Sequence, residues 1–119
     1  MPIIVVEGPT IAAGQSLSDA IDLTAGRPVR LTMPAGWTPA NLTFQISTDG
    51  QFFNDLYALD GRRAREVLVG GVSPGIGVAL AGLTGNVHYR VRSGTARNPV
   101  PQSEERVFAV AIETPETTP

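Results

Sequence analysis

Apolar and polar residues alternate with a period of two in three well-separated segments of the chain. In Asn41–Ser47, for example, Leu42, Phe44 and Ile46 alternate with polar residues. The other two alternating segments are Val29–Met33 and Val87–Ser93. Because successive side chains of a β-strand point to opposite faces, this alternation predicts strands with one face in the core and one in water.

Glycine and proline divide the rest of the chain into short pieces. The 119 residues include 13 glycines and 10 prolines, spread along the whole length, and such punctuation suits strands rather than long helices. Asp49-Gly50 and Asp60-Gly61 are strong hairpin signals. Weaker strands are predicted at Ile3–Val6, Leu17–Leu23, Phe52–Tyr57, Glu66–Val69 and Val78–Ala81. The pattern predicts an all-β protein, an antiparallel β-sandwich that is jelly-roll-like, with about eight or nine short strands.

The parity of the strands predicts the core. We expect the side chains that share the apolar face of each strand to be buried, namely Leu31, Phe44, Ile46, Tyr89, Val91, Phe108, Val110 and Ile112. The segment Arg106–Glu113 differs because its second face, formed by Val107, Ala109 and Ala111, is also apolar. Such a strand is either central in its sheet or covered by a neighbouring molecule, and the chain's own loop Gly70–Gly77 is an alternative cover.

Length and composition indicate one domain. We expect residues 1–113 to form a single β-sandwich and residues 114–119, rich in threonine and proline, to form an extended tail. No stretch approaches the roughly 20 apolar residues of a spanning helix, and the N-terminal residues lack the basic region of an export signal. The sequence therefore predicts neither membrane insertion nor export.

Several classes of chemistry find no support in the sequence. There is no cysteine, and the formal net charge of −2 argues against a general nucleic-acid binder. All nine basic residues are arginine, so the Gly70–Gly77 loop lacks the lysine of a phosphate-binding loop. His88 is the one histidine, and we interpret it as a solvent-facing or interface residue, with a binding or catalytic role as the weaker alternatives. The chain is predicted to have no catalytic residue, cofactor or metal site.

Two further groups are candidates for an interface. Trp37 lies between Pro34 and Pro39, where it is either a lid over one end of the sandwich, an interface anchor or a sugar-stacking platform. Arg62, Arg63 and Arg65 form either a solvated loop or an anchor for carboxylates of a partner. The complete set of interface candidates is Trp37, Arg62, Arg63, Arg65, Val107, Ala109 and Ala111.

Four segments resemble small virion proteins of tailed bacteriophages and prophages. They are Thr10–Leu23, Met33–Gln45, Ser47–Tyr57 and Tyr89–Thr95, and the resemblance runs from Thr10 to about Ile112. It implies a non-enzymatic structural component of the virion, made in the host cytoplasm: a capsid decoration or cement protein, or a fibre, neck or tail accessory protein. The implied partners are capsid, neck or tail subunits, bound as a homo-oligomer or on a lattice.

A second, shorter resemblance leaves an alternative open. The pattern Ser47-x-Asp49-Gly50-x-x-Phe53 is similar to the strand–turn–strand of discoidin-like and carbohydrate-binding β-sandwiches. It implies a carbohydrate-binding module for host-surface attachment, with a surface glycan as the ligand. No sugar-binding residues are carried over from it.

Overall fold

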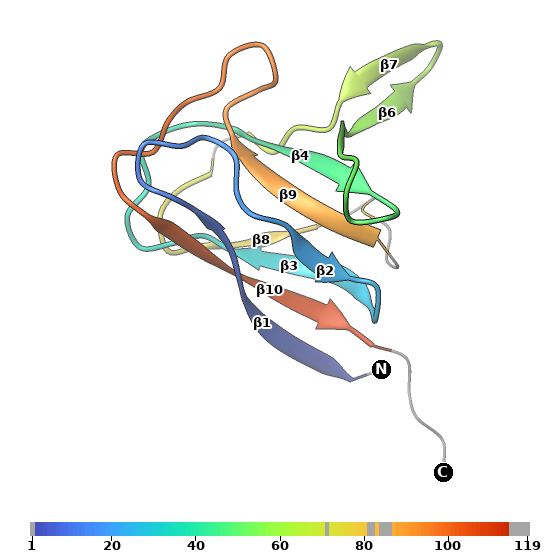
Figure 1. Cartoon of the computed structure of the whole chain (residues 1–119), viewed down its shortest axis with the longest axis horizontal. Helices are drawn as coiled ribbons and strands as arrows, with labels where there is room; N and C mark the ends of the chain where they lie inside the picture. The colour runs from blue at the N-terminus through green and yellow to red at the C-terminus, as the bar shows by residue number, and fades with distance from the viewer. Residues whose placement is uncertain (1, 71, 81–82, 84–86, 115–119) are drawn as a thin grey trace.

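The structure, a computed structural model of the chain, describes residues 2–70, 72–80, 83 and 87–114. In this part of the chain all regular structure is β, in ten strands (Figure 1). The strands are β1 Ile3–Ile11, β2 Ile21–Leu23, β3 Arg27–Thr32, β4 Leu42–Ser47, β5 Asn54–Asp55, β6 Tyr57–Asp60, β7 Arg63–Glu66, β8 Gly77–Ala79, β9 Val87–Ser93 and β10 Arg106–Glu113. The predicted all-β fold is confirmed, with one more strand than the upper expectation.

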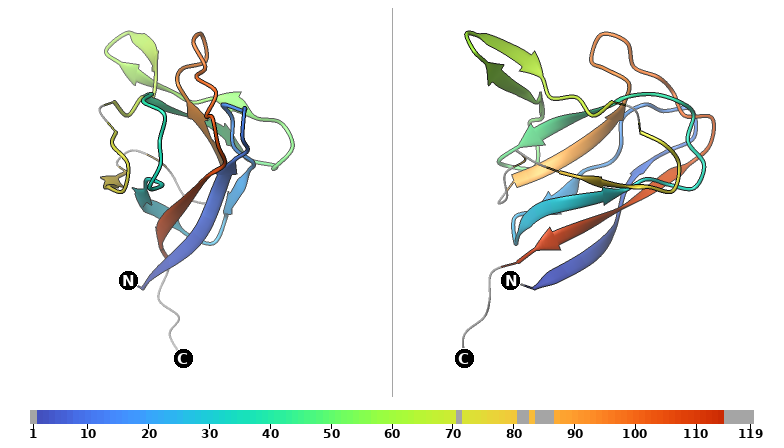
Figure 2. Two further views of the ribbon diagram at one scale, coloured as in Figure 1. Left: turned by 90° about the vertical axis from the view of Figure 1, so that its left-hand side faces the viewer. Right: turned by 180° about the vertical axis from the view of Figure 1, so that it is seen from behind.

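Two four-stranded antiparallel sheets form the body of the molecule. One sheet has the order β1-β10-β3-β8 and the other β2-β9-β4-β5, while β6 and β7 pair only with each other. Within the two sheets the pairs are nested, because β1 pairs with β10, β2 with β9, β3 with β8 and β4 with β5. The first three strands therefore lie beside late strands of the chain, as Figure 2 shows, and only the innermost pair, β4 and β5, joins consecutive strands.

The core lies between the two sheets and follows the predicted parity. Seven of the eight expected core residues are buried, and Ile46 is partly buried. Residues of both sheets are among the most buried, including Ile11 and Leu31 from one sheet and Leu42 and Phe44 from the other. The alternation of apolar and polar residues thus predicts which face of each strand packs against the opposite sheet.

Strand β10 is central, because it pairs with β1 on one side and β3 on the other. On its outer face Ala111 is 2% exposed, and its register partners are Val5 and Arg30, whose side chains share that face. Val107 and Ala109 are half-buried. Cover by a neighbouring molecule remains a prediction. The alternative cover, the Gly70–Gly77 loop, accepts and donates backbone hydrogen bonds with Met33 and Pro34 beside β3.

The hairpin between β4 and β5 explains why Gly50 is required. Its φ of +78° lies in the left-handed region, as predicted for the turn, and a Cβ there would lie 3.1 Å from Nε2 of His88. The preceding carboxylate of Asp49 accepts hydrogen bonds from the backbone N–H groups of Gln51 and Phe52 and from the Ser47 hydroxyl. These bonds hold the pKa of Asp49 below its usual value of 3.8. The charged form of Asp49 therefore closes the turn.

The last strand of the sandwich, β10, ends at Glu113, the last residue of the expected domain. The N–H of Thr114 donates a 3.0 Å hydrogen bond to the carbonyl of Pro2, which continues the β1–β10 ladder beyond Glu113. Residues 115–119, the rest of the predicted tail, lie outside the described residues.

Candidate interaction site

A hairpin projects from the sandwich between β5 and β8. We call the segment Tyr57–Glu66, which consists of β6, β7 and the turn at Gly61-Arg62, the arm. Figures 1 and 2 show it standing away from both sheets in every view. Leu59 is 80% exposed and Tyr57 is 51% exposed. A two-stranded hairpin without a packed face gains little stability from its own contacts. The exposed side chains of Leu59 and Tyr57 lie where a partner protein could cover them.

The two faces of the arm differ in chemistry. Tyr57 pairs with Glu66 and Leu59 with Ala64, so these side chains share one face. Ala58 pairs with Arg65 and Asp60 with Arg63, and the side chains of Arg63 and Arg65 share the other face. The first face is mainly apolar towards its tip, and the second carries two arginines. The third, Arg62, lies in the turn, and all three arginines are exposed. The structure therefore places the predicted arginine group on a projecting hairpin rather than in a simple loop.

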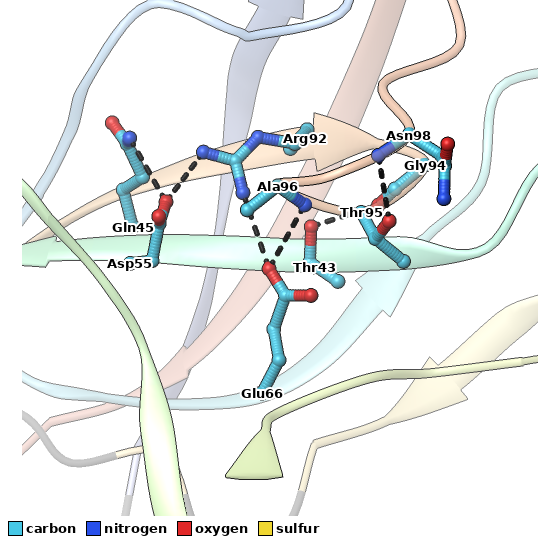
Figure 3. A network of polar contacts seen from close by, with 9 residues as sticks. All are labelled: Thr43, Gln45, Asp55, Glu66, Arg92, Gly94, Thr95, Ala96 and Asn98. Atoms are coloured by element: carbon cyan, nitrogen blue, oxygen red, sulfur yellow. Dashed lines mark hydrogen bonds and ion pairs between the residues drawn. The ribbon is translucent and has the colours of Figure 1, made fainter.

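A buried arginine fixes the base of the arm. Arg92 of β9 is 8% exposed and forms an ion pair with Asp55 of β5 and a second one, of 3.3 Å, with Oε2 of Glu66. The same Glu66 oxygen accepts a hydrogen bond from the N–H of Ala96, and Gln45 Nε2 donates to Asp55 (Figure 3). Glu66 is the last residue of the arm, and Asp55 lies in β5, shortly before the arm begins. Arg92 thus connects the end of the arm to β5 and β9 of the sandwich.

The connection to Arg92 stabilises the charged form of Asp55. The hydrogen bond from Arg92 lowers the pKa of Asp55 below its usual value of 3.8, the Gln45 hydrogen bond adds to this effect, and partial burial opposes it. The carboxylate is therefore ionised at neutral pH. We refer to Arg92, Asp55 and Glu66 together as the clasp.

The clasp has no signature in the amino-acid sequence. The alternation of Val87–Ser93 predicts a water-facing Arg92, and this prediction is wrong because the base of the arm covers that side of β9. Arg92 is 26 residues from Glu66 and 37 from Asp55 along the chain. No motif spacing links residues at such distances, so only the fold reveals the contact.

A hollow of about 490 Å³ lies next to the clasp, between the segments that follow β9 and precede β4. It is lined by Pro39, Ala40, Asn41, Val72, Gly94, Thr95, Asn98 and Val100. The carbonyl of Gly94 accepts a 2.8 Å hydrogen bond from the Thr43 hydroxyl, which holds this wall in place (Figure 3). None of the lining residues titrates near neutral pH. The hollow offers shape and neutral hydrogen-bonding groups, but no acid or base from its lining.

Trp37 is not part of an exposed site. It is 7% exposed, its ring meets Phe108 edge-to-face at a centroid distance of 5.6 Å, and its Nε1 donates to the Ala40 carbonyl. The ring packs inward, as expected for a lid over one end of the sandwich. The roles of Trp37 as an interface anchor or a sugar-stacking platform remain predictions, and its burial does not favour them. Ala111 is similarly inaccessible, whereas Val107 and Ala109 are half-buried on the outer face.

His88 lies on the surface of the second sheet. It is half-buried and faces Asp22 of β2 in the strand register. The pKa of Asp22 is lowered, first by the hydroxyl and N–H of Thr24 and least by His88. Within the described residues no group of three or more histidine, cysteine or acidic side chains could hold a metal ion. The absence of catalysis remains a prediction.

A second hollow, of about 220 Å³, adjoins the β4–β5 turn. It is lined by Ile46, Ser47, Thr48, Asp49, Phe52 and Asn54. The ring of Phe52 is 77% exposed beside these polar groups. The neighbouring Phe53, which belongs to the pattern similar to carbohydrate-binding sandwiches, is covered by the guanidinium of Arg90 at 4.1 Å from the ring centroid. Phe52, not Phe53, is therefore the ring available for stacking at this turn.

Comparisons with family models, with curated proteins and with solved structures found no significant match to this chain. In the part of the chain that the structure describes, no helix has the length and hydropathy needed to cross a membrane.

Proposed function

We propose that this protein is a non-enzymatic structural component of a bacteriophage particle that binds neighbouring protein subunits through its arm. A single observation carries the proposal: the arm projects from the sandwich with Leu59 80% exposed, yet the clasp fixes its base. A hairpin held in one orientation with an apolar face and a basic face suits docking onto another protein, because little ordering entropy is lost on binding. Capsid, neck or tail subunits are the proposed partners.

The nested strand pairing supports the same proposal. We interpret the sandwich as a jelly roll with the arm inserted between β5 and β8. Viral capsid domains and lectin domains share this architecture, although a fold by itself does not determine a function. The jelly-roll architecture therefore supports two candidate classes, a virion protein and a carbohydrate-binding module.

The arm is tested by reversing one charge. We expect the Arg63→Glu variant to bind purified particles about tenfold more weakly than the wild type, since a like charge would face the carboxylates of the partner. Binding is measured by adding the protein back to particles that lack it and sedimenting them. Arg97→Glu is the matched control, because Arg97 is also exposed but lies outside the arm. Equal binding by both variants would show that the arm is not the docking surface.

The alternative function is a carbohydrate-binding module, and the exposed ring of Phe52 beside the 220 Å³ hollow is the observation in its favour. The two functions are separated by a glycan array. Retention on a glycan that is lost in Phe52→Ser but kept in Arg63→Glu would support the carbohydrate-binding module. Particle binding that depends on Arg63 but not on Phe52 supports the virion protein.

A further inference from the structure

The first strand leaves one long sheet edge open. The other edge strands, β8, β2 and β5, contain three, three and two residues, whereas β1 contains nine. Proteins commonly protect sheet edges with short strands, charges or proline. The first half of β1, Ile3–Val6, contains no charged residue and no proline. Its side chains are also open to solvent, because Ile3, Ile4 and Val5 are 51%, 47% and 64% exposed.

The hydrogen-bond pattern shows which backbone groups point to this open edge. The Thr114 N–H donates to the Pro2 carbonyl, so the pair at Pro2 and Thr114 is hydrogen-bonded. Hydrogen-bonded and non-hydrogen-bonded pairs alternate along an antiparallel ladder, which assigns the β10-facing bonds to Ile4 and Val6. The N–H and C=O groups of Ile3, Val5 and Glu7 consequently face away from β10. Beyond Glu7 the register shifts, and Pro9 has no N–H to offer.

We infer that two copies of this chain pair through β1, antiparallel and centred on Val5, so that the two β1-containing sheets join across a two-fold axis. In this register Val5 faces Val5 of the second copy, and Ile3 faces Glu7. All three outward-facing residues of each copy then exchange hydrogen bonds, and the pairing ends where the register shift begins. The inference concerns a different surface from the arm and does not depend on the proposed function.

A second copy is favoured as the occupant by charge and by symmetry. Glu7 is the only charged residue among Ile3–Glu7, and the register places it opposite an uncharged isoleucine rather than opposite itself. The pairing is therefore self-complementary without like charges in contact, as a two-fold interface requires. It also places the exposed side chains of Ile3 and Val5 next to those of the second copy. Because a pair of five-residue strands is small compared with the roughly 1,200–2,000 Å² of a standard interface, we expect a dimer that dissociates on dilution.

The test begins with the mass in solution. The wild type, of 12.5 kDa, should approach twice this mass at high protein concentration in sedimentation equilibrium. Val5→Pro should remain monomeric, because proline removes an outward-facing N–H while keeping every bond to β10. Val5→Thr keeps the N–H and the branched shape, so this control should still dimerise. An unchanged circular dichroism spectrum establishes that Val5→Pro is folded. Wild-type protein that is monomeric at all concentrations would overturn the inference.

The register is tested by introducing cysteine into a chain that has none. In the inferred dimer the Cα atoms of the two Val5 residues lie about 5.5 Å apart, within the ~4.4–6.8 Å range of a disulfide. The two Ile3 residues are separated by four residues along the strand, roughly 13 Å. Val5→Cys should therefore cross-link rapidly under mild oxidation and Ile3→Cys slowly, although both positions are similarly exposed. Equal rates would exclude the register centred on Val5 and with it this dimer.

Discussion

Replacing Phe108 by alanine should lower the free energy of unfolding by about 3–5 kcal/mol. Its side chain is 1% exposed, lies on the inner face of the central strand β10, and packs edge-to-face against Trp37. The variant loses the transfer free energy of the ring, the aromatic contact and the packing around the resulting cavity. Urea unfolding followed by Trp37 fluorescence measures the change.

The matched control is Val107→Ala in the same strand. Val107 is the next residue towards the N-terminus, and its half-buried side chain lies on the opposite face of β10. Because less apolar surface is lost and no enclosed cavity forms, we expect a cost below about 1.5 kcal/mol. Similar costs for the two variants would mean that the inner and outer faces of β10 are wrongly assigned.

The position of Phe108 was predictable because strand parity is a local property. The side-chain period of two is visible in any window of six residues, and one face must be buried for the sheet to be stable. Ile46, the one expected core residue that is only partly buried, is the last residue but one of β4 and packs against the core from its periphery. Local pattern therefore predicts the direction of a side chain better than the depth at which it lies.

Buried polar contacts were not predictable, because they join residues that are distant in the sequence. Gln102 is fully buried in the connection between β9 and β10. Its Nε2 donates to the Thr38 carbonyl and the Ser93 hydroxyl, while its Oε1 accepts from the Thr38 N–H and from Nε of Arg106. Glutamine is tolerated there because both ends of its amide are satisfied. That condition depends on the tertiary structure.

The candidate site was predictable in the same partial way. Arg62, Arg63 and Arg65 could be grouped because they lie within four positions of the sequence. The Asp60-Gly61 signal correctly predicted a hairpin turn beside them. The separation of an apolar face from a basic face follows from the register of β6 and β7, which the sequence leaves open. The clasp depends in addition on the return of the chain to β9, so Arg92 appeared to be one more water-facing residue of an alternating strand.

Replacing Arg92 by methionine should release the base of the arm and lower the free energy of unfolding by about 2 kcal/mol. Removing one partner of a fully buried ion pair costs about 3–5 kcal/mol, but the Asp55 side chain is 35% exposed and water would partly compensate it. Methionine retains much of the packing of the arginine stem. Trypsin cleavage after the exposed Arg62, Arg63 and Arg65 should become faster, because a released arm is a better protease substrate.

Arg97→Met provides the control for the loss of an arginine. Arg97 is exposed, so its replacement should change stability by less than about 0.5 kcal/mol and leave cleavage of the arm unchanged. Faster cleavage in both variants, or in neither, would contradict the role of Arg92 as the connection between arm and sandwich.

Acid should weaken the clasp in the same way as the substitution. The pKa of Asp55 is lowered in the folded protein, so the carboxylate contributes stability above its unfolded pKa of about 3.9 and loses this contribution as the pH falls through the lower folded value. Asp55→Asn should therefore be less stable than the wild type at pH 7, and the difference in unfolding free energy should shrink below about pH 4. A difference that stays constant into acid would show that the charge of Asp55 does not hold the arm. In acid, the difference in unfolding free energy between the wild type and Asp55→Asn should disappear, and the wild-type arm should lose its protection against pepsin over the same pH range. This result would show that the ionised Asp55 carboxylate holds the proposed docking surface in its orientation.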